Sequence, residues 1–277
     1  VFGDWSSDVC SSDLFTAAAL LLAIWGVPHA AAREDVLRAD GEAVTVYFPP
    51  ALAVSADEIL WMVPRLKQDL AARFGRPFPG PVTIYLIDDA DLFARMIGRP
   101  YFSAYVRPDA GVVVIDHTKM NPGPLTLETT LKHELCHLLL HRSIPPPHLP
   151  RWLDEGVAQW YSDGFSELLA ADGGEGLRRA VLSDAVPTLD EVNGDFALDR
   201  TRVMLAYEAS RSAVDYLIRE YGVAGLLGLL EALGGGATLD AAFPEALGVS
   251  PGEFEAGWRR TLVKTDAWWV VGSIHLY

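Results

Sequence analysis

Three residues in one short stretch of the sequence have the side chains and the spacing of a metal centre. His133 and His137 lie four residues apart, with Glu134 between them. Residues four apart lie on the same side of an α-helix, so both imidazoles can bind one ion. Glu134 is turned by roughly 100° from His133, close enough to contact a water on the metal but poorly placed as a ligand. Neutral imidazole suits zinc, and a catalytic zinc needs three protein ligands and one open position.

The surrounding sequence predicts the helix that these residues need. Leucines recur at three- and four-residue spacing over residues 127–139, which indicates a helix with one buried face that ends at about Arg142. Three prolines at 145–147 cannot continue it, because proline lacks an amide donor and disfavours helix before it. Pro150 is well suited to begin a second helix, expected over residues 151–163.

Glu155 on this second helix is the candidate for the third ligand. Two antiparallel helices joined by a short loop can bring its carboxylate beside the two imidazoles. Gly156 has no side chain and could let helices approach closely. Asp154 is the alternative ligand, although a shift of one residue turns it about 100° away.

The two helices together resemble the active-site signature of the gluzincin metallopeptidases, in particular the peptidase MA-like group. The matching segments are His133–His137 and Leu149–Ala158, and a later match at Ala206–Ser210 extends the resemblance over about residues 43–233. The resemblance implies hydrolysis of peptide bonds, with one zinc ion as cofactor and a peptide or protein as substrate.

The resemblance also implies the roles of the central residues. His133, His137 and Glu155 would bind the zinc, and Glu134 would be the general base for a zinc-activated water. Two other function classes would share all of these residues. They are a zincin-fold binding module without catalysis and a zinc hydrolase that acts on a non-peptide amide.

Three further roles follow from the resemblance. Tyr207 matches the position of a donor to the oxyanion, although a tyrosine among leucines and valines is also an ordinary core residue. Gln159 occupies the position where thermolysin-like relatives carry an aspartate that contacts a histidine ligand, and it can accept a hydrogen bond only as a neutral group. Gly111, Val112 and Val113 begin a strand that looks like the family's edge strand, which binds extended peptide by strand addition.

The remaining histidines and Cys136 are not expected to be metal ligands. His141 continues the histidine stripe, and a histidine in the last turn of a helix interacts favourably with the helix dipole. Cys136 is expected to pack in the core. His117 and His148 are either cleft or surface residues, and they are the replacement candidates if Tyr207 is not the oxyanion donor.

The pattern of elements predicts an α+β, zincin-like fold. Strands are expected at 43–48, 81–87, 104–106 and 111–115, with helices at 55–74, 90–97, 201–221, 224–233 and 251–265. Pro64 is expected to interrupt or kink its helix. We therefore expect an N-terminal α/β lobe with a small mixed sheet and the active-site helix at 33–142, and a mostly helical lobe at 143–265. The resemblance places the zinc cleft between them.

Both ends of the sequence are expected to lie outside this domain. Residues 1–14 are interpreted as an artefact, because 4–14 resemble the translation of a sequencing adapter. The apolar run in 15–32 ends in three alanines and predicts a truncated signal peptide, hence export to the periplasm or the cell exterior. Residues 266–277 are apolar and aromatic, either a buried tail or the start of a truncated membrane anchor, and are too short to span a bilayer alone.

Composition narrows the function classes further. A net charge of −15 over 277 residues argues against nucleic acid, which requires a basic surface. The hydrophobic content of 50% is ample for a core. One of the two cysteines, Cys10, falls in the adapter-like segment, so neither a disulfide framework nor a cysteine-based zinc site is expected. The sequence leaves the oligomeric state open.

Overall fold

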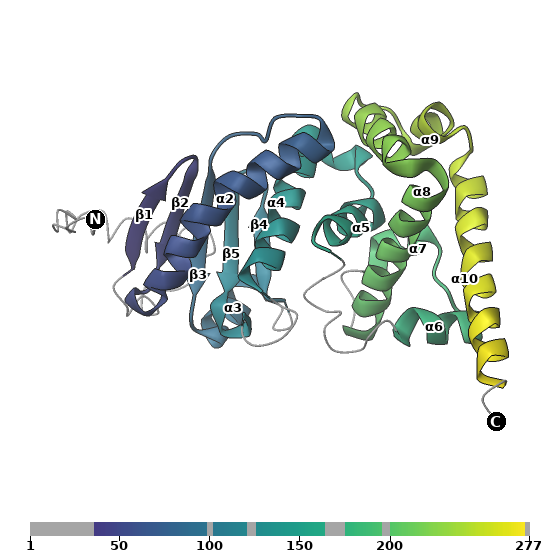
Figure 1. The fold of residues 1–277 in the computed structure, drawn as a ribbon, viewed down its shortest axis with the longest axis horizontal. Helices are drawn as coiled ribbons and strands as arrows, with labels where there is room; N and C mark the ends of the chain where they lie inside the picture. The colour runs from purple at the N-terminus through teal and green to yellow at the C-terminus, as the bar shows by residue number, and fades with distance from the viewer. Residues whose placement is uncertain (1–35, 99–101, 121–125, 164–174, 196–199, 275–277) are drawn as a thin grey trace. The chain divides into compact units, whose positions relative to one another are not determined.

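The chain is a mixed α+β protein that forms two compact units. The computed structural model describes residues 36–98, 102–120, 126–163, 175–195 and 200–274. The first unit comprises the described parts of Val1–Lys67 and Gly80–Asn121, and the second those of Gln68–Pro79 and Pro122–Tyr277. A five-stranded sheet lies in the first unit, and the second is mostly helical (Figure 1). This agrees with the expected fold class, whereas the lobe limits at 142 and 143 stay a prediction.

The sheet of the first unit is mixed. Its strands are β1 (Leu37–Gly41), β2 (Val44–Phe48), β3 (Val82–Ile87), β4 (Ala104–Arg107) and β5 (Val112–Asp116). They are arranged in the order β1-β2-β3-β5-β4. The central pairs β2–β3 and β3–β5 are parallel, and the outer pairs β1–β2 and β4–β5 are antiparallel. Strand β1 is not among the strands expected from the sequence.

One strand expectation was wrong. The strand that begins after Gly111 was expected to be the edge strand, but β5 lies between β3 and β4. Val112 and Val113 pair with β3 on one side and β4 on the other, so both sides of the strand are already hydrogen-bonded. Strand addition at Gly111, Val112 and Val113 therefore loses its basis, and β4 is the strand at this edge of the sheet.

Two α-helices accompany the sheet. Helix α2 (Ala53–Phe74) follows a 3-10 turn at Pro50–Leu52 and continues through Pro64, where an interruption or kink was expected. Helix α3 (Ala90–Ile97) is capped by Asp89, whose side chain accepts the Leu92 amide at 2.8 Å. A second 3-10 turn (His117–Lys119) follows β5.

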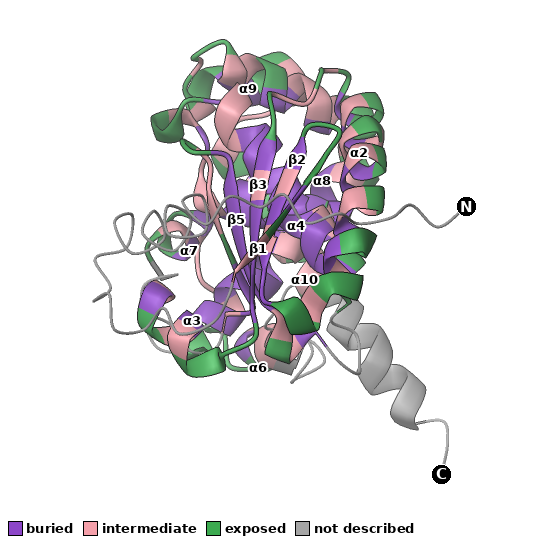
Figure 2. Ribbon diagram, turned by 90° about the vertical axis from the view of Figure 1, so that its left-hand side faces the viewer, coloured by how far each residue is buried: buried purple, intermediate pink, exposed green. Residues whose placement is uncertain are grey.

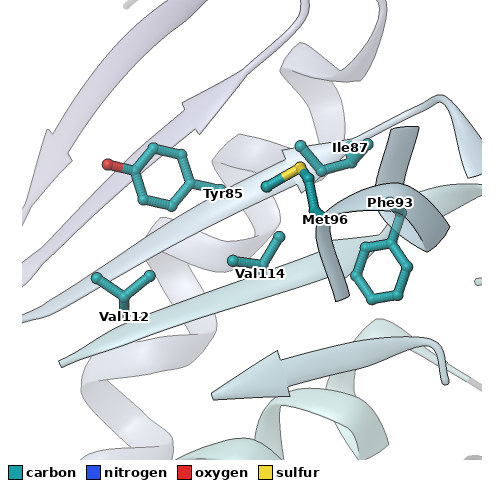
Figure 3. Close-up of a cluster of buried hydrophobic side chains, with 6 residues drawn as sticks. All are labelled: Tyr85, Ile87, Phe93, Met96, Val112 and Val114. Atoms are coloured by element: carbon teal, nitrogen blue, oxygen red, sulfur yellow. The ribbon is translucent and has the colours of Figure 1, made fainter. Parts of the chain in front are cut away.

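Apolar side chains fill the space between α3 and one face of the sheet. Alternate residues of β3 and β5 point to this face, as the two-residue period of a strand requires. Figure 3 shows the cluster, which consists of Tyr85, Ile87, Phe93, Met96, Val112 and Val114. The intervening residues Ile84, Leu86, Val113 and Ile115 are buried as well. Strand β5 is buried along its whole length, and β3 is buried except at Thr83 (Figure 2). A sheet covered on both faces explains why these strands are almost entirely apolar.

The second unit is built from helices. They are α4 (Leu127–Ser143), α5 (Arg151–Tyr161), α6 (Glu175–Leu182), α7 (Leu189–Asp195), α8 (Arg200–Gly234), α9 (Leu239–Leu247) and α10 (Pro251–Ile274), with a 3-10 turn at Pro146–His148. Helix α5 packs against both α4 and α8. Helix α8 is broken at Gly222, whose φ of 73° lies in the left-handed region. This is the break expected between residues 221 and 224.

The predictions for the two ends of the chain remain open. The adapter-like and leader-like segments lie outside the described residues. Helix α10 continues into the apolar tail and ends at Ile274. Within the described part of the chain, no helix combines the length and the apolar character that crossing a membrane requires.

Candidate metal centre

Helix α4 carries the two histidines of the centre. Thr126 caps its N-terminus, because the Thr126 hydroxyl accepts the Thr129 amide at 3.1 Å and the Thr129 hydroxyl accepts the Thr126 amide. His133 and His137 are 4% and 6% exposed. The helix therefore places both imidazoles, one turn apart, inside the second unit.

Helix α5 supplies the carboxylates. It begins after Pro150, whose carbonyl accepts the amides of Leu153 and Asp154 at 3.0 and 3.1 Å. Asp154 and Glu155 are both buried. Because α5 packs against α4, two consecutive acidic residues face the histidines from the neighbouring helix.

Three side-chain atoms converge at the contact between these helices. Nε2 of His133 and Nε2 of His137 lie 3.1 Å apart. The Oε2 atom of Glu155 lies 3.7 Å from the first nitrogen and 3.5 Å from the second. The structure thus brings together the three residues that were expected to be ligands, and the buried group can hold one metal ion.

Glu155 is a buried carboxylate whose nearest basic groups among the described residues are the two imidazoles and, at the limit of an ion pair, Arg151. Its Oε2 atom has no hydrogen-bond partner among the described residues, and its Oε1 atom lies 3.9 Å from Nε of Arg151. Burial alone would raise the pKa of Glu155, but His137 and His133 outweigh it and lower the pKa to about 2. An ionised carboxylate aimed at two imidazoles is an arrangement that a cation stabilises.

Asp154 contacts the opposite edge of the His137 ring. Its Oδ1 atom lies 2.8 Å from Nδ1 of His137, and its Oδ2 atom lies 2.7 Å from Nε2 of His141. Burial opposes a charge on Asp154, but the two histidines outweigh it and hold its pKa below the usual range. Burial likewise opposes a charge on His137, but the carboxylates of Asp154 and Glu155 hold its pKa well above the usual value. Asp154 is therefore an outer partner of His137.

Gln159 has a different position from the one expected. Its amide donates to the carbonyl oxygens of Glu155 at 3.2 Å and Tyr207 at 3.0 Å. Its Oε1 atom and Nδ1 of His133 are both buried and have no hydrogen-bond partner among the described residues. Gln159 thus links α5 to α8, while the carboxylate that contacts His137 belongs to Asp154.

Gly156 fixes the distance between α5 and α8. A Cβ at this position would lie 2.5 Å from the carbonyl oxygen of Ser210 and 2.6 Å from Cγ2 of Val214. Only glycine leaves room for the backbone of α8 at this point. The close approach expected for Gly156 exists, and it positions the helix that carries Glu155 against α8.

The remaining candidates are distributed over both units. Glu134 is buried on α4 next to His133, and Tyr207 is buried on α8. His148 contacts the Ala237 carbonyl through Nδ1 at 3.0 Å. In the first unit, Nε2 of His117 lies 2.8 Å from the Ser55 hydroxyl. Both of these histidines therefore have local partners.

The outer contacts of His137 were not found from the sequence. Asp154 was considered only as an alternative ligand, and His141 was assigned to the helix dipole. The signal was the spacing, because His141 lies one turn after His137 and Asp154 directly precedes Glu155. Spacing cannot show that one carboxylate lies between two imidazoles, since this depends on how two helices pack.

Comparison with known proteins gives the family. No curated protein matches this chain. A family model described as the Peptidase MA superfamily matches residues 64–264, which include α4, α5 and α8. That match and the buried group of two histidines and one glutamate suggest a metallopeptidase. The chain belongs to the Peptidase MA superfamily.

Proposed function

We propose that this protein is a zinc-dependent peptidase whose metal is held by His133, His137 and Glu155. The observation that carries the proposal is the set of 3.1, 3.5 and 3.7 Å separations between their ligand atoms. Zinc binds nitrogen and oxygen ligands at about 2.0–2.1 Å, so two ligands of a tetrahedral ion lie about 3.3 Å apart. The three atoms fit such an ion.

The chemistry of the ligand set supports zinc as well. Two imidazoles and a carboxylate form a combination found in catalytic zinc sites, and three protein ligands leave one position open. Cys136 is fully buried, and neither of the two groups of ligand atoms that lie within 4.8 Å of one another among the described residues includes its thiol. When bound, zinc would polarise the scissile carbonyl and lower the pKa of a bound water molecule to about 7.

Glu134 is the proposed general base. Its carboxylate would take a proton from the attacking water and deliver it to the leaving amine. Its position next to His133 on the same buried helical turn supports this role, because the packing that fixes the ligand also fixes the neighbouring residue.

Tyr207 is the proposed donor to the oxyanion that develops on the carbonyl oxygen of the substrate. It lies on α8, and its own carbonyl accepts a hydrogen bond from Gln159, one helical turn after Glu155. This bond connects the backbone of the proposed donor to the helix of the proposed ligand.

We also propose that the protein is exported after cleavage of an N-terminal leader. Sequencing of the mature N-terminus tests this proposal, because an uncleaved leader would contradict it.

The function is tested with the purified chain and a peptide library. We expect one zinc per chain and cleavage that stops when a chelator removes the metal and returns when zinc is added. Stoichiometric zinc without cleavage of any peptide would instead support a non-catalytic binding module. Cleavage confined to non-peptide amides would support the other hydrolase class, and a chain without metal that still cleaves peptides would contradict the zinc mechanism.

A further inference from the structure

The carboxylate of Asp154 lies between two imidazoles on α4. One oxygen contacts Nδ1 of His137 at 2.8 Å and the other contacts Nε2 of His141 at 2.7 Å. Asp154 is buried, whereas the side chain of His141 is 30% exposed. The three residues form a continuous chain from the centre of the second unit toward its surface, and we call it the His137–Asp154–His141 chain.

The direction of both hydrogen bonds follows from the proposed metal site. If His137 binds a metal through Nε2, its remaining proton is on Nδ1, which then donates to Asp154. An ionised carboxylate only accepts, so the second bond must be donated by Nε2 of His141. The chain therefore has two donors at its ends and one acceptor in the middle, and every contact in it is satisfied.

A second metal ion is the competing explanation, because the possible ligand atoms of His137, His141 and Asp154 also lie within 4.8 Å of one another. Two metals would require His137 to use both ring nitrogens and to lose its last proton. The hydrogen-bonded chain needs no such deprotonation, and both of its distances are those of ordinary hydrogen bonds. The observed distances thus favour a single metal with an outer chain.

We propose that His141 is a positioning residue for the metal ligand His137 and that it acts through Asp154. The proposal rests on the proposed metal site. Asp154 can hold the imidazole in one orientation only if its own carboxylate is held, and His141 provides the second contact. Without that donor, a buried carboxylate oxygen loses its partner, which favours rotation of Asp154 away from the ring. Nδ1 of His133 has no hydrogen-bond partner among the described residues. Of the two proposed histidine ligands, only His137 is therefore held by a hydrogen bond from its second ring nitrogen to a described residue.

The test compares zinc affinity in the full chain and four variants. His141→Leu removes the donor. His141→Gln keeps a nitrogen donor near the position of Nε2. Asp154→Asn keeps the shape of the middle residue but not its charge. Tyr161→Phe is the matched control. It removes another hydrogen bond of α5, the 2.9 Å contact to Asp69, and leaves the His137–Asp154–His141 chain unchanged.

Dissociation constants are measured by competition with a chelating indicator, so the result needs no hydrolysis. Loss of an outer partner typically weakens metal binding by about 10- to 100-fold. We expect the Asp154 variant within this range, the leucine variant near its lower end, and the glutamine and Tyr161 variants close to wild type. Melting of each metal-free variant identifies loss of folding.

NMR of histidine nitrogens in the unaltered zinc-loaded chain provides a readout that does not depend on variants. We expect a proton on Nδ1 of His137 and on Nε2 of His141. A folded leucine variant with wild-type zinc affinity, or a second equivalent of zinc bound by wild type, would overturn the proposal, as would His137 without a proton on Nδ1. Zinc binding that follows the expected order without peptide hydrolysis would contradict the proposed function alone.

Discussion

The two compact units bury different kinds of side chain. Between α3 and the sheet of the first unit, the core is apolar (Figure 3). In the second unit, α4 and α5 bury five residues with an imidazole or a carboxyl group, namely His133, Glu134, His137, Asp154 and Glu155. The buried carboxylate of the first unit, Asp116, lies 3.1 Å from Lys119, whereas Glu155 has no lysine or arginine closer than Arg151 at 3.9 Å among the described residues.

This difference shows how each core reaches electrical balance. Burying a carboxylate is costly unless an opposite charge compensates it. The first unit compensates Asp116 with its own lysine, whereas in the second unit Glu155 faces two imidazoles with which it could bind a metal ion. Changes in the second core should therefore affect metal binding and catalysis, and changes in the first should affect stability alone.

The largest effect is expected from Glu134→Gln. The amide cannot take a proton from water, so turnover should fall by about 10²–10⁴-fold, the usual contribution of a general base. Zinc content should remain at the wild-type level, because Glu134 is not one of the three proposed ligands. Peptide hydrolysis at equal zinc loading measures the effect. Activity near wild type would show that Glu134 is not the base.

Glu155→Ala removes one of the three proposed ligands. We expect zinc affinity to fall by more than about a hundredfold, beyond the loss of an outer partner. Competition with a chelator measures this change. Unchanged stoichiometric zinc binding would remove Glu155 from the site and would leave Asp154 as the alternative ligand.

Tyr207→Phe tests the oxyanion donor. Turnover should fall by about a hundredfold, which is typical of the loss of one donor, with zinc and substrate affinity nearly unchanged. Separate determination of kcat and KM distinguishes this role from a structural one. Full turnover in a folded variant would contradict this role and would leave Tyr207 as an ordinary core residue.

Gly156→Ala tests the packing of α5 on α8. The new methyl group would lie 2.5 Å from the Ser210 carbonyl oxygen, so one helix must shift. We expect the free energy of unfolding to fall by about 1–3 kcal/mol, together with weaker zinc binding. Gly194→Ala on α7 is the control, because nothing lies within 4 Å of its added Cβ. Equal melting of both variants would contradict the role of the close contact.

The smallest effect is expected in the first unit. Ile84 on β3 is fully buried, and Ile84→Val should lower the free energy of unfolding by about 0.5–1.5 kcal/mol. Zinc affinity and turnover of the folded protein should not change. A clear loss of zinc affinity in this variant would contradict the claim that changes in the first core affect stability alone.

The sequence predicted the helices of the centre and the pair of histidines because both depend on local spacing, whereas the role of Glu155 on the second helix came from the resemblance to a known family. The leucine pattern indicated α4, Pro150 indicated the start of α5, and Gly222 marked the break in α8. Each of these signals acts within a few residues of the feature that it predicts.

Features that depend on distant segments were missed or misassigned. Strand order cannot be derived from alternation along one strand, and β5 was therefore taken for an edge strand. Strand β1, with one buried residue among five, lacks the apolar pattern of a buried strand. The contact of Asp154 with His137 and His141 depends on the packing of α5 against α4.

The most direct test of the metal centre is X-ray absorption at the zinc edge of the full chain loaded with one equivalent of zinc. We predict two imidazole nitrogens and carboxylate oxygen at about 2.0–2.1 Å, with no sulfur in the first shell. A sulfur ligand at about 2.3 Å, which would implicate Cys136, or a third imidazole would contradict the assignment of His133, His137 and Glu155 as the zinc ligands.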